Sequence, residues 1–497
     1  MTQARSRTVS TTEQNTLSAY FDDVFVDGGW RPAAGPGRIE IVNPATEKVW
    51  GSVPDASEAD VDAAVRAASA AFARPGWSRL AAEERAVVLR RFADELEVRG
   101  AAMAAHITAE NGTPISESRS AAAHSAGILR YFAGLAGWLD AEDRRPFPGG
   151  DNYTLVRRQP IGVCALIAPW NFPLTLVMVK LAPALLAGCT VVIKPASETP
   201  VDLRVLIEAA IAAGIPAGVI NLVTGSRVAG GHLVTHPLVD KVAFTGSTAA
   251  GRIIAAQCGS LLRPVTLELG GKSAAIVLPD ADLDNFSSLV LRTCLRNTGQ
   301  TCYNSTRILA PVALYDETVE RVVREVRQAQ QGDPLDPLTV FGPVVSARQR
   351  ESIEGYIGIG RAEGARIATG GTPSEFDRGY YVTPTVFRDV TSSMRVAQEE
   401  IFGPVLVVLP YSDEADAVRI ANDSSFGLGG AIFGTDEEHA TSLAARIDSG
   451  SIGINFYGSN LAAPFGGRKD SGLGTEYGPE GVSAYLALKS VHRLGRD

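Results

Sequence analysis

The sequence predicts an α/β protein built on doubly wound parallel sheets. Short apolar runs alternate with helical patterns from Ile161 onward, and a second alternating block begins near Ser273. Strands that alternate with helices pair in parallel, because each helix carries the chain back to the start of the next strand. The 497 residues are also too many for one hydrophobic core, so we expect two or three domains.

The first alternating block has a clear order of elements. Gly188 and Gly214 end its two helices, since glycine readily adopts the left-handed conformation that closes a helix. Ligands of such sheets bind at the carboxyl ends of the strands. The expected elements are a strand over Val163–Ala168, a helix over Leu174–Ala187, a strand over Thr190–Ile193, a helix over Leu203–Ala213, and strands over Val219–Val223 and Lys241–Phe244.

The flanking regions carry other patterns. We expect the first 135 or so residues to be mainly helical, with one long amphipathic pattern over Ala82–Thr108. Two alternating strands, Tyr153–Arg158 and Tyr485–Leu494, fit neither block, and such strands often join the sheet of a partner. The strands expected in the second block are Arg307–Ala310, Val405–Leu409 and Gly430–Phe433.

Charge and composition exclude several classes of protein. The chain has 46 basic and 55 acidic residues and a net charge of −9, which argues against a nucleic-acid partner. Five scattered cysteines suggest no disulfide framework and fit a reducing cytoplasm. The apolar region Ile161–Ile193 is not expected to span a membrane, because Asn171 and Lys180 interrupt it. Nothing in the sequence calls for a metal.

Cys302 carries the strongest chemical signal. It ends the turn-rich stretch Asn297–Cys302, between an expected helix and the apolar run Ile308–Ala310. A turn at a helix end can favour the thiolate, which is the nucleophilic form of cysteine. The other four cysteines lie in apolar or helical runs and are expected to be core residues: Cys164, Cys189, Cys258 and Cys294.

A glycine-containing turn follows the strand that ends at Phe244. Gly246-Ser247 begins the turn, and Gly251 lies in the helix that it opens. Glycines at such a junction let a backbone approach a phosphate, and the helix N-terminus attracts the anion. The alternative is that the glycines serve tight packing of the helix on the strand. The spacing matches neither a P-loop nor GxGxxG.

Three polar residues end or follow strands. Lys194 could bind a ribose or phosphate, or could be an ordinary surface lysine. Glu268 ends the apolar run Val265–Leu267, where burial would raise its pKa and make it a general base; the alternative is a solvated carboxylate. Asn171 could donate to an oxyanion, or could serve only its turn.

Together these features make the sequence similar to the aldehyde dehydrogenase superfamily. The matching stretches occur in the family's order and extend over nearly the whole chain beyond the N-terminal stretch. They are Pro169-Trp170-Asn171-Phe172-Pro173, Lys194-Pro195, Phe244-Thr245-Gly246-Ser247, Glu268-Leu269-Gly270-Gly271-Lys272, Gly299-Gln300-Thr301-Cys302, Glu400-Ile401-Phe402-Gly403-Pro404-Val405 and Pro464-Phe465-Gly466-Gly467.

The resemblance implies a mechanism. Cys302 would attack the aldehyde to give a thiohemiacetal, whose oxyanion Asn171 and the Cys302 backbone N–H would hold. Hydride transfer to NAD or NADP would leave a thioester, and Glu268 would activate the water that releases the acid. Relatives that pass the acyl group to coenzyme A typically lack this glutamate, so Glu268 favours hydrolysis.

The resemblance also implies a cofactor site. Lys194 would hold the adenosine ribose, Ser247 the pyrophosphate and Glu400 the nicotinamide ribose, with Phe402 beside it. Many relatives that prefer NAD have a glutamate three residues after this lysine, where this chain has Ser197, with Glu198 one residue later. A serine would not repel a 2′-phosphate, so both cofactors stay open. The remaining implied cofactor contacts are Trp170, Gly225, Phe244, Gly251 and Leu269.

The implied aldehyde tunnel combines an apolar lining with one arginine. Relatives that oxidise carboxylate-bearing semialdehydes often have arginine at the position of Arg296, so it could bind an anionic substrate. Alternatively, Arg296 faces away and makes an internal ion pair. Thr301 and Tyr303 flank the nucleophile. The apolar residues expected to line the tunnel, which favour a hydrophobic aldehyde, are Leu176, Val179, Phe456 and Phe465.

By the same resemblance we expect two doubly wound Rossmann-like α/β domains plus a small β oligomerisation arm. Residues 18–140 and 160–270 would form the NAD(P)-binding domain, and residues 271–475 the catalytic domain. Residues 141–159 and 476–497 would form the arm of a homodimer or homotetramer. Residues 1–17, rich in Ser, Thr, Gln and Arg, would be a flexible tail without the apolar core of a signal peptide.

Two other interpretations of Cys302 carry less support. A thiol hydrolase would need a histidine partner, but none of the six histidines lies in a matching motif. A structural relative that had lost activity would not be expected to keep Cys302, Glu268, Asn171 and Lys194 together.

Overall fold

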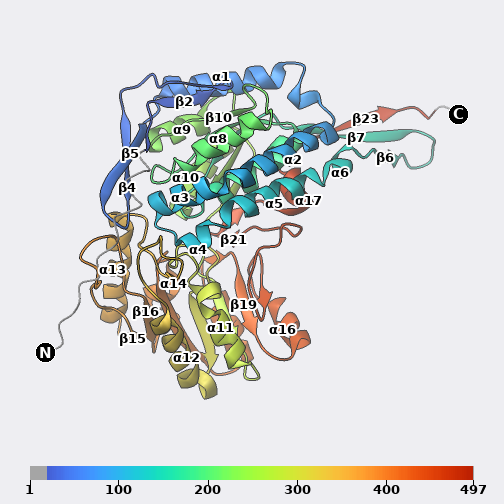
Figure 1. Cartoon of the computed structure of the whole chain (residues 1–497). Coiled ribbons are helices and arrows are strands. Elements are labelled where there is room, and N and C mark those ends of the chain that lie inside the picture. Colours follow the sequence, from blue (N-terminus) through green and yellow to red (C-terminus); the bar gives the residue numbers. More distant parts are fainter. Residues whose placement is uncertain (1–18, 496–497) are drawn as a thin grey trace.

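The computed structural model describes residues 19–495, and its largest sheet has eight strands in the order β22-β12-β11-β8-β9-β10-β2-β3 (Figure 1). The central strands are mutually parallel and nearly all buried, as expected for strands covered by helices on both faces. The tail predicted over residues 1–17 lies outside the described residues. The central strands are β8 (Val163–Ile167), β9 (Thr190–Lys194), β10 (Ile220–Leu222), β11 (Lys241–Thr245) and β12 (Val265–Glu268).

Helices cover both faces of this sheet. Helices α1 (Glu58–Ala73), α9 (Arg227–Thr235) and α10 (Thr248–Ser260) pack on one face. Helix α7 (Pro173–Ala187) lies on the other face and is apolar all round, because α2 (Ala82–Val98) and α5 (Ala121–Ala133) cover its outer side. The remaining helices of this part are α3 (Gly100–Asn111), α4 (Ile115–Ser118), α6 (Ala136–Asp140) and α8 (Asp202–Ala212).

The prediction of a mainly helical N-terminal region is wrong for residues 19–54, which form strands. A hairpin of β2 (Asp23–Val26) and β3 (Gly29–Pro32) adds an antiparallel edge to the large sheet. Its turn, Asp27-Gly28, has positive φ at both residues. The separate sheet is formed by β1 (Ala19–Tyr20), β4 (Arg38–Asn43) and β5 (Lys48–Pro54). The long amphipathic pattern divides at Arg99 into α2 and α3.

The second large sheet has the order β15-β16-β17-β14-β13-β19-β20 and is parallel except for β15. The predicted strands of the second block are confirmed. Its strands are β13 (Ala274–Val277), β14 (Arg307–Pro311), β15 (Arg366–Thr369), β16 (Thr385–Arg388), β17 (Val405–Tyr411), β19 (Gly430–Phe433) and β20 (Gly453–Ile454). Its helices are α11 (Leu283–Cys294), α12 (Tyr315–Gln328), α13 (Ala347–Ala362), α14 (Arg395–Gln398), α15 (Glu414–Asn422) and α16 (Glu437–Ala444).

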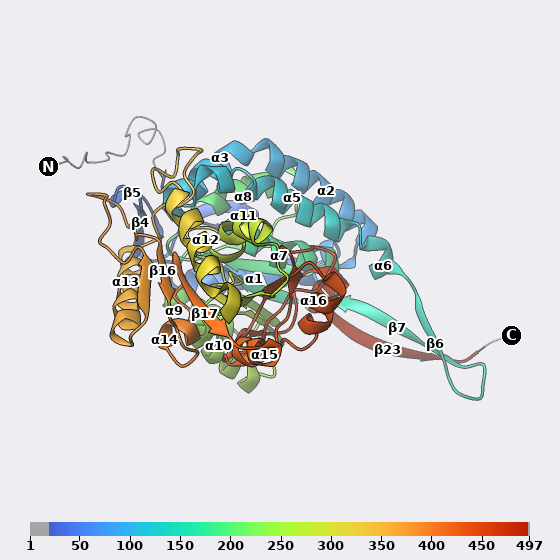
Figure 2. The same ribbon diagram turned by 90° about the horizontal axis from the view of Figure 1, so that it is seen from below.

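A three-stranded antiparallel arm projects from the molecule (Figure 2). Both strands predicted outside the alternating blocks belong to it: β7 (Tyr153–Pro160) pairs with β23 (Leu486–Arg493), and β6 (Asp143–Pro146) completes the sheet. Before the arm, α17 (Gly478–Ser483) returns the chain to the first part. The short strands are β18 (Phe426–Gly427), β21 (Arg468–Lys469) and β22 (Gly472–Leu473). Within residues 19–495, no helix combines the length and apolar character that crossing a membrane requires.

Candidate active site

A cavity of about 400 Å³ opens where the strand order of the large sheet reverses. The reversal lies between β8 and β11, and parallel sheets bind ligands at such a point. Pro169, Trp170 and Asn171 follow β8 and line the cavity, as do Gly246 and Ser247 after β11. We call this space the switch-point cavity.

The switch-point cavity has the donor set of a dinucleotide site. The Ser247 hydroxyl caps α10, accepting a hydrogen bond from the Ala250 N–H, so the helix N-terminus faces the cavity. Such a terminus attracts phosphate. Across the cavity, Glu400 Oε1 accepts the Gly271 N–H at 2.9 Å, and burial raises its pKa to about 7. The Trp170 and Phe402 rings meet edge to face at 5.2 Å. These groups suit phosphates, ribose hydroxyls and a flat ring.

Seven of the residues expected to bind the cofactor line this cavity, and the others lie nearby in the fold. The Lys194 ammonium is buried and donates to the Pro195 carbonyl, and burial lowers its pKa to about 8. Ser197 Oγ donates to the Gly225 carbonyl at 3.4 Å, whereas Glu198 lines the cavity. The seven are Trp170, Glu198, Gly246, Ser247, Leu269, Glu400 and Phe402.

Two pairs of the expected cofactor residues pack closely against each other: Gly251 with Leu269, and Gly246 with Phe244. A Cβ on Gly251 would approach Leu269 Cδ2 to 2.5 Å, so this glycine lets α10 pack against the chain after β12. A Cβ on Gly246 would collide with the Phe244 ring. The packing alternative therefore describes what Gly251 does in the structure, while Gly246 also borders the cavity.

Cys302 lines the same cavity at the end of a left-handed turn. Asn297, Thr298 and Gly299 have φ values of 53°, 54° and 78° in succession. The turn closes tightly, because a Cβ on Gly299 would collide with the Gly403 carbonyl. Its geometry depends on glycine at this position.

The expectation that a helix end lowers the Cys302 pKa is wrong. Helix α11 ends at Cys294, and the loop that carries Cys302 follows its C-terminus, where the dipole disfavours an anion. Burial raises the pKa of the thiol well above its usual range, and Glu400 and Glu268 raise it further. Backbone N–H groups of Tyr303 and Cys302 oppose this shift. The remaining cysteines are buried, as predicted.

Asn171 is held by hydrogen bonds on both its amide and its backbone. Its Nδ2 donates to the Gln300 carbonyl at 3.0 Å, and its own carbonyl accepts from Asn297 Nδ2 at 2.9 Å. These bonds tie the loop after β8 to the loop that carries Cys302. The Asn171 side chain is therefore held in the wall of the cavity that Cys302 also lines.

Glu268 ends β12 as a buried carboxylate without a partner. Neither of its carboxylate oxygens has a hydrogen-bond partner within the described residues. Burial raises its pKa well above the usual range, and the nearby Glu476 adds to the shift, whereas Lys180 opposes it. The raised pKa expected at this position is thus present.

Two neighbours of Glu268 were not predicted as site residues. The Lys180 ammonium, fully buried in α7, contacts Glu476 Oε1 at 2.5 Å and the Thr245 hydroxyl at 2.6 Å. The sequence did contain one signal for Lys180, namely a lysine inside an apolar helical pattern. Such a lysine is expected where its buried charge has a buried partner. Glu476 had no local signal, because its partner is 296 residues away in the sequence.

The glycine pair after Glu268 brings the two halves of the site together. A Cβ on Gly270 would approach Glu400 Oε2 to 2.5 Å, and a Cβ on Gly271 would collide with the Cys302 carbonyl. The Ser471 hydroxyl donates to the Gly270 carbonyl at 2.7 Å. Glycine is therefore required where β12 of the first sheet leads into the second.

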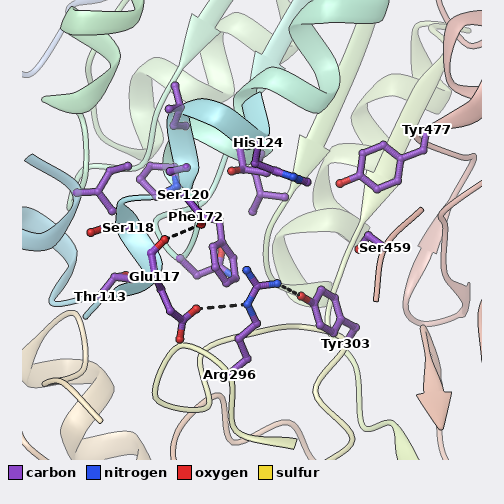
Figure 3. A pocket seen from close by; sticks show the side chains of 17 residues that line it. Thr113, Glu117, Ser118, Ser120, His124, Phe172, Arg296, Tyr303, Ser459 and Tyr477 are labelled. Carbon is purple, nitrogen blue, oxygen red and sulfur yellow. Dashed lines mark hydrogen bonds and ion pairs between the residues drawn. The ribbon is translucent and has the colours of Figure 1, made fainter. Parts of the chain in front are cut away.

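A second, smaller cavity of about 100 Å³ shares Asn171 with the first (Figure 3). Aromatic and apolar side chains form much of its wall, including Phe172, Leu176 and Tyr477. Tyr303, the residue after Cys302, also lines this cavity. Its ring lies tilted against the Tyr457 ring, with the ring centroids 5.0 Å apart. We call this space the aldehyde pocket, after the substrate tunnel that the sequence resemblance predicts, because Asn171, Arg296 and Tyr303 line it.

Arg296 makes the ion pair of the second alternative but does not face away from the site. It lines the aldehyde pocket, and it also makes an ion pair, with Nε 3.3 Å from Glu117 Oε2. Its Nη1 donates to the Tyr303 hydroxyl at 2.6 Å, and its guanidinium lies 5.2 Å from the centre of the Phe172 ring. Figure 3 shows the guanidinium held between Glu117 and Tyr303.

Other residues expected in the tunnel lie elsewhere. Thr301 is buried, and its hydroxyl donates a hydrogen bond to the Arg296 carbonyl at 3.0 Å. Val179 is buried in the core around α7. The Phe465 ring packs against Tyr477 at 5.8 Å, one layer behind the pocket. Phe456 is 60% exposed, and neither cavity includes it in its lining. No group of His, Cys, Asp and Glu side chains in residues 19–495 is arranged to hold a metal ion.

Comparisons with known proteins agree over almost the full length. A family model described as "Aldehyde dehydrogenase family" matches residues 30–491. Geranial dehydrogenase of Castellaniella defragrans is 51% identical over 473 residues, which cover 95% of this chain and 98% of that protein.

Two solved structures share the fold. The crystal structure of Mycobacterium tuberculosis aldehyde dehydrogenase complexed with NAD+ has a TM-score of 0.93 at 43% identity, covering 96% of this chain and 98% of that one. A mutant of aldehyde dehydrogenase C from Pseudomonas syringae, solved with NAD+ and octanal, has a TM-score of 0.89 at 40% identity, covering 95% and 96%.

Proposed function

Since the chain belongs to the aldehyde dehydrogenase family, we propose that it oxidises an aldehyde to the carboxylic acid through a thioester on Cys302. The family resemblance seen in the sequence is confirmed, and membership makes the protein an NAD(P)-dependent aldehyde oxidoreductase. The observation that carries the finer proposal is the buried carboxylate of Glu268, whose oxygens have no partner among the described residues. A free, buried carboxylate beside the nucleophile is suited to take a proton from water.

The first step needs a nucleophile and a hydrogen-bond donor for the oxyanion, both lining one cavity. Cys302 and Asn171 both line the switch-point cavity. When the thiolate sulfur of Cys302 bonds to the carbonyl carbon, the C=O double bond becomes a single bond, and the oxygen takes the negative charge, which the Asn171 amide N–H stabilises. The donor is already ordered by its bond to Gln300, so little reorganisation accompanies attack.

Bound NAD or NADP supplies the hydride acceptor. Ser247 at the N-terminus of α10 would hold the pyrophosphate, and Glu400 would hold a ribose through its hydroxyls. Trp170 and Phe402 would pack beside the ring system. Glu198, a carboxylate on the cavity wall, would repel a 2′-phosphate, which supports NAD as the preferred cofactor.

Hydrolysis completes the cycle. Glu268 takes a proton from water as the water oxygen bonds to the thioester carbon; the C–S bond then breaks, and the sulfur of Cys302 leaves as thiolate. The raised pKa of Glu268 makes it a stronger base than an ordinary carboxylate. Lys180 and Glu476 form an ion pair near Glu268, and we propose that this pair sets the charge state of the Glu268 carboxylate.

The aldehyde pocket supports a hydrophobic substrate. The wall of the pocket would present aromatic rings and a branched aliphatic chain to the substrate, from Phe172, Leu176, Tyr303 and Tyr477. The geranial dehydrogenase relative and the octanal-bound structure are named for apolar aldehydes, which agrees with such a lining.

We also propose an assembly and a location, and one observation supports each. The exposed strand β23 at the edge of the arm supports a homodimer or homotetramer, in which the arm adds to the sheet of a neighbouring subunit. The cysteines are all free thiols, which supports a reducing compartment such as the cytoplasm.

Substitution of the nucleophile tests the proposal. Cys302→Ala should lower kcat for NADH formation from an apolar aldehyde by about 10³-fold or more, because no other group can form the covalent intermediate. NAD binding, followed by protein fluorescence, should remain, since Cys302 is only one part of the cavity wall. Residual turnover near the wild-type rate would overturn the assignment.

Substitution of the base separates the two half-reactions. Glu268→Gln should release close to one NADH per active site in a rapid burst and then nearly stop, because the thioester forms but water is not activated. Mass spectrometry of the quenched protein should find the acyl group on the Cys302 peptide. Steady-state turnover equal to wild type would refute Glu268 as the base.

A further inference from the structure

We propose that Glu117 is a specificity-determining residue that neutralises Arg296 and so makes the aldehyde pocket select uncharged aldehydes over carboxylate-bearing ones. The inference rests on the proposed function and deepens it by naming the charge class of the substrate. It starts from the contacts of a single carboxylate at the rim of the pocket.

Both carboxylate oxygens of Glu117 accept hydrogen bonds from the short segment Arg296-Asn297. Oε2 accepts Arg296 Nε at 3.3 Å, and Oε1 accepts the backbone N–H of Asn297 at 3.1 Å. The two bonds lock the carboxylate onto the start of the left-handed turn that leads to Cys302. Glu117 therefore cannot swing away from Arg296 without giving up the second bond.

Arg296 is equally constrained. Nε is taken by Glu117 and Nη1 by the Tyr303 hydroxyl, and Phe172 covers the face of the guanidinium. Of the five N–H groups of the guanidinium, three on Nη1 and Nη2 are left, but Glu117 already balances its charge, so a substrate carboxylate would meet an arginine whose counter-ion is in place.

The remaining groups add no positive charge to the pocket. Arg296 and Glu117 are its only formally charged lining residues, and their charges cancel. Burial lowers the pKa of His124, and Arg296 lowers it further, so this imidazole is neutral at physiological pH. A substrate carboxylate would thus enter without a free counter-ion, and it would meet the Glu117 carboxylate at the rim.

This arrangement explains how an arginine can line a pocket that takes hydrophobic aldehydes. The guanidinium acts as a flat wall, fixed edge-on between Glu117 and Tyr303 (Figure 3). Aldehydes with apolar or neutral polar bodies can lie against it. Its charge becomes available to a substrate only when Glu117 is neutral.

The test compares succinic semialdehyde with its methyl ester, which differ at the pocket mainly in charge. Wild-type kcat/KM should favour the ester. Glu117→Gln should raise the ratio of semialdehyde to ester by about fivefold, a size typical of partly exposed charge pairs. Glutamine keeps one oxygen for the Asn297 N–H, and the ratio of the two substrates separates a change in charge selection from any general change in activity.

Two further variants assign the effect. Glu117→Gln combined with Arg296→Gln should return the ratio to near the wild-type value, because the uncovered charge is gone. Glu317→Gln, the same change in an ion pair with Arg321 on α12, should leave the ratio unchanged. A purely structural role for Glu117 would lower both activities together and leave the ratio fixed.

The outcomes are distinct. An unchanged ratio in Glu117→Gln, or a raised ratio that persists in the double variant, would overturn the inference while leaving aldehyde oxidation intact. A wild type that oxidises the semialdehyde as well as the ester would also overturn it. A wild type with intact Cys302 that oxidises no aldehyde would instead refute the proposed function on which the inference rests.

Discussion

At the scale of single residues, the surroundings of Cys302, the proposed nucleophile, favour the less reactive thiol over the thiolate. Burial, Glu400 and Glu268 all raise the pKa of the Cys302 thiol. Because the thiolate is the reactive species, the resting enzyme keeps little of it at neutral pH. Such a thiol is protected from oxidation and alkylation until a cofactor or substrate changes the charges around it. Glu400, which is expected to bind the cofactor ribose, is one of those charges.

Alkylation of the free enzyme tests this protection. The pKa of Glu400 is raised to about 7, so its carboxylate is charged at pH 8.5 and opposes the Cys302 thiolate. Glu400→Gln removes that charge, lowers the thiol pKa and should speed alkylation of Cys302 by iodoacetamide about threefold. Mass spectrometry of the Cys302 peptide measures the rate independently of turnover.

The neighbouring carboxylate offers a matched control. Glu399 pairs with Arg395 and bonds the Tyr356 hydroxyl, and it does not line the switch-point cavity. Glu399→Gln should therefore leave the alkylation rate close to wild type. An unchanged or slower rate in Glu400→Gln would mean that Glu400 does not govern the thiol.

The sequence could point to candidate site residues whose signal lies in their residue type and their position at the end of an element. Cys302, Asn171, Glu268 and Ser247 each end or follow a predicted element, and the sheet topology brings strand ends together. Residues whose role depends on a distant partner were not identified. Glu117 is an ordinary polar residue until the fold brings it to Arg296, 179 positions away.

At the scale of elements, helix α8 begins on a buried pair of carboxylates. Glu110 Oε2 accepts the Val201 N–H at 2.9 Å, and Oε1 accepts the Asp202 N–H at 3.2 Å, so Glu110 caps the first turn. Both side chains are fully buried, and neither Asp202 oxygen has a partner among the described residues. Burial raises the pKa of both carboxyl groups, and their mutual repulsion adds to the shift of Glu110.

Removing one carboxylate should flatten the dependence of stability on pH. The folded pKa values are raised, so the folded state holds protons that the unfolded chain releases above about pH 4. Stability from this pair is therefore lost as pH rises through the folded pKa values. Asp202→Asn removes one titrating group and supplies an amide donor to Glu110. Melting temperatures at pH 5.5, 7 and 8.5 should fall less steeply than in wild type.

An exposed acid in an equivalent helical position controls for general effects. Asp316 lies in the first turn of α12 and pairs with Arg388 on the surface. Asp316→Asn should keep the wild-type slope of melting temperature against pH. A slope for Asp202→Asn as steep as wild type would show that the buried pair does not titrate in this range.

The regular elements were predicted where the pattern was local. Strands β8, β9, β11, β14, β17 and β19 follow apolar runs, and glycines mark the ends of α7 and the turn after α8. Strand β3 was missed because it is short and has no fully buried residue, whereas β4 has the alternating apolar residues Ile39 and Ile41, which were a usable strand signal. The turn at Asp27-Gly28 was a usable signal, since this dipeptide favours the turn of a two-residue hairpin.

At the scale of the whole molecule, the two large sheets meet at the site. The switch-point cavity takes walls from the chain after β8 and β11 of the first sheet and from the segment around Glu400 and Phe402 before β17 of the second. The glycine pair at Gly270-Gly271 makes the connection close enough for Glu400 and Cys302 to share one cavity with the loops after β8 and β11. Neither part alone holds a complete set of reacting groups.

The arm adds a surface that the rest of the molecule does not cover. Strand β23 lies at the edge of its sheet, and Leu488 on it is 70% exposed. An exposed edge strand with apolar side chains pairs readily with another chain. Leu488→Asp should therefore lower the mass measured by size-exclusion chromatography with light scattering, because an unpaired carboxylate is costly to bury in an interface. The same change at Leu338, which is 72% exposed in a loop, should leave the mass unchanged. An unaltered mass for Leu488→Asp would exclude this part of β23 from the subunit contact and would place assembly on another surface.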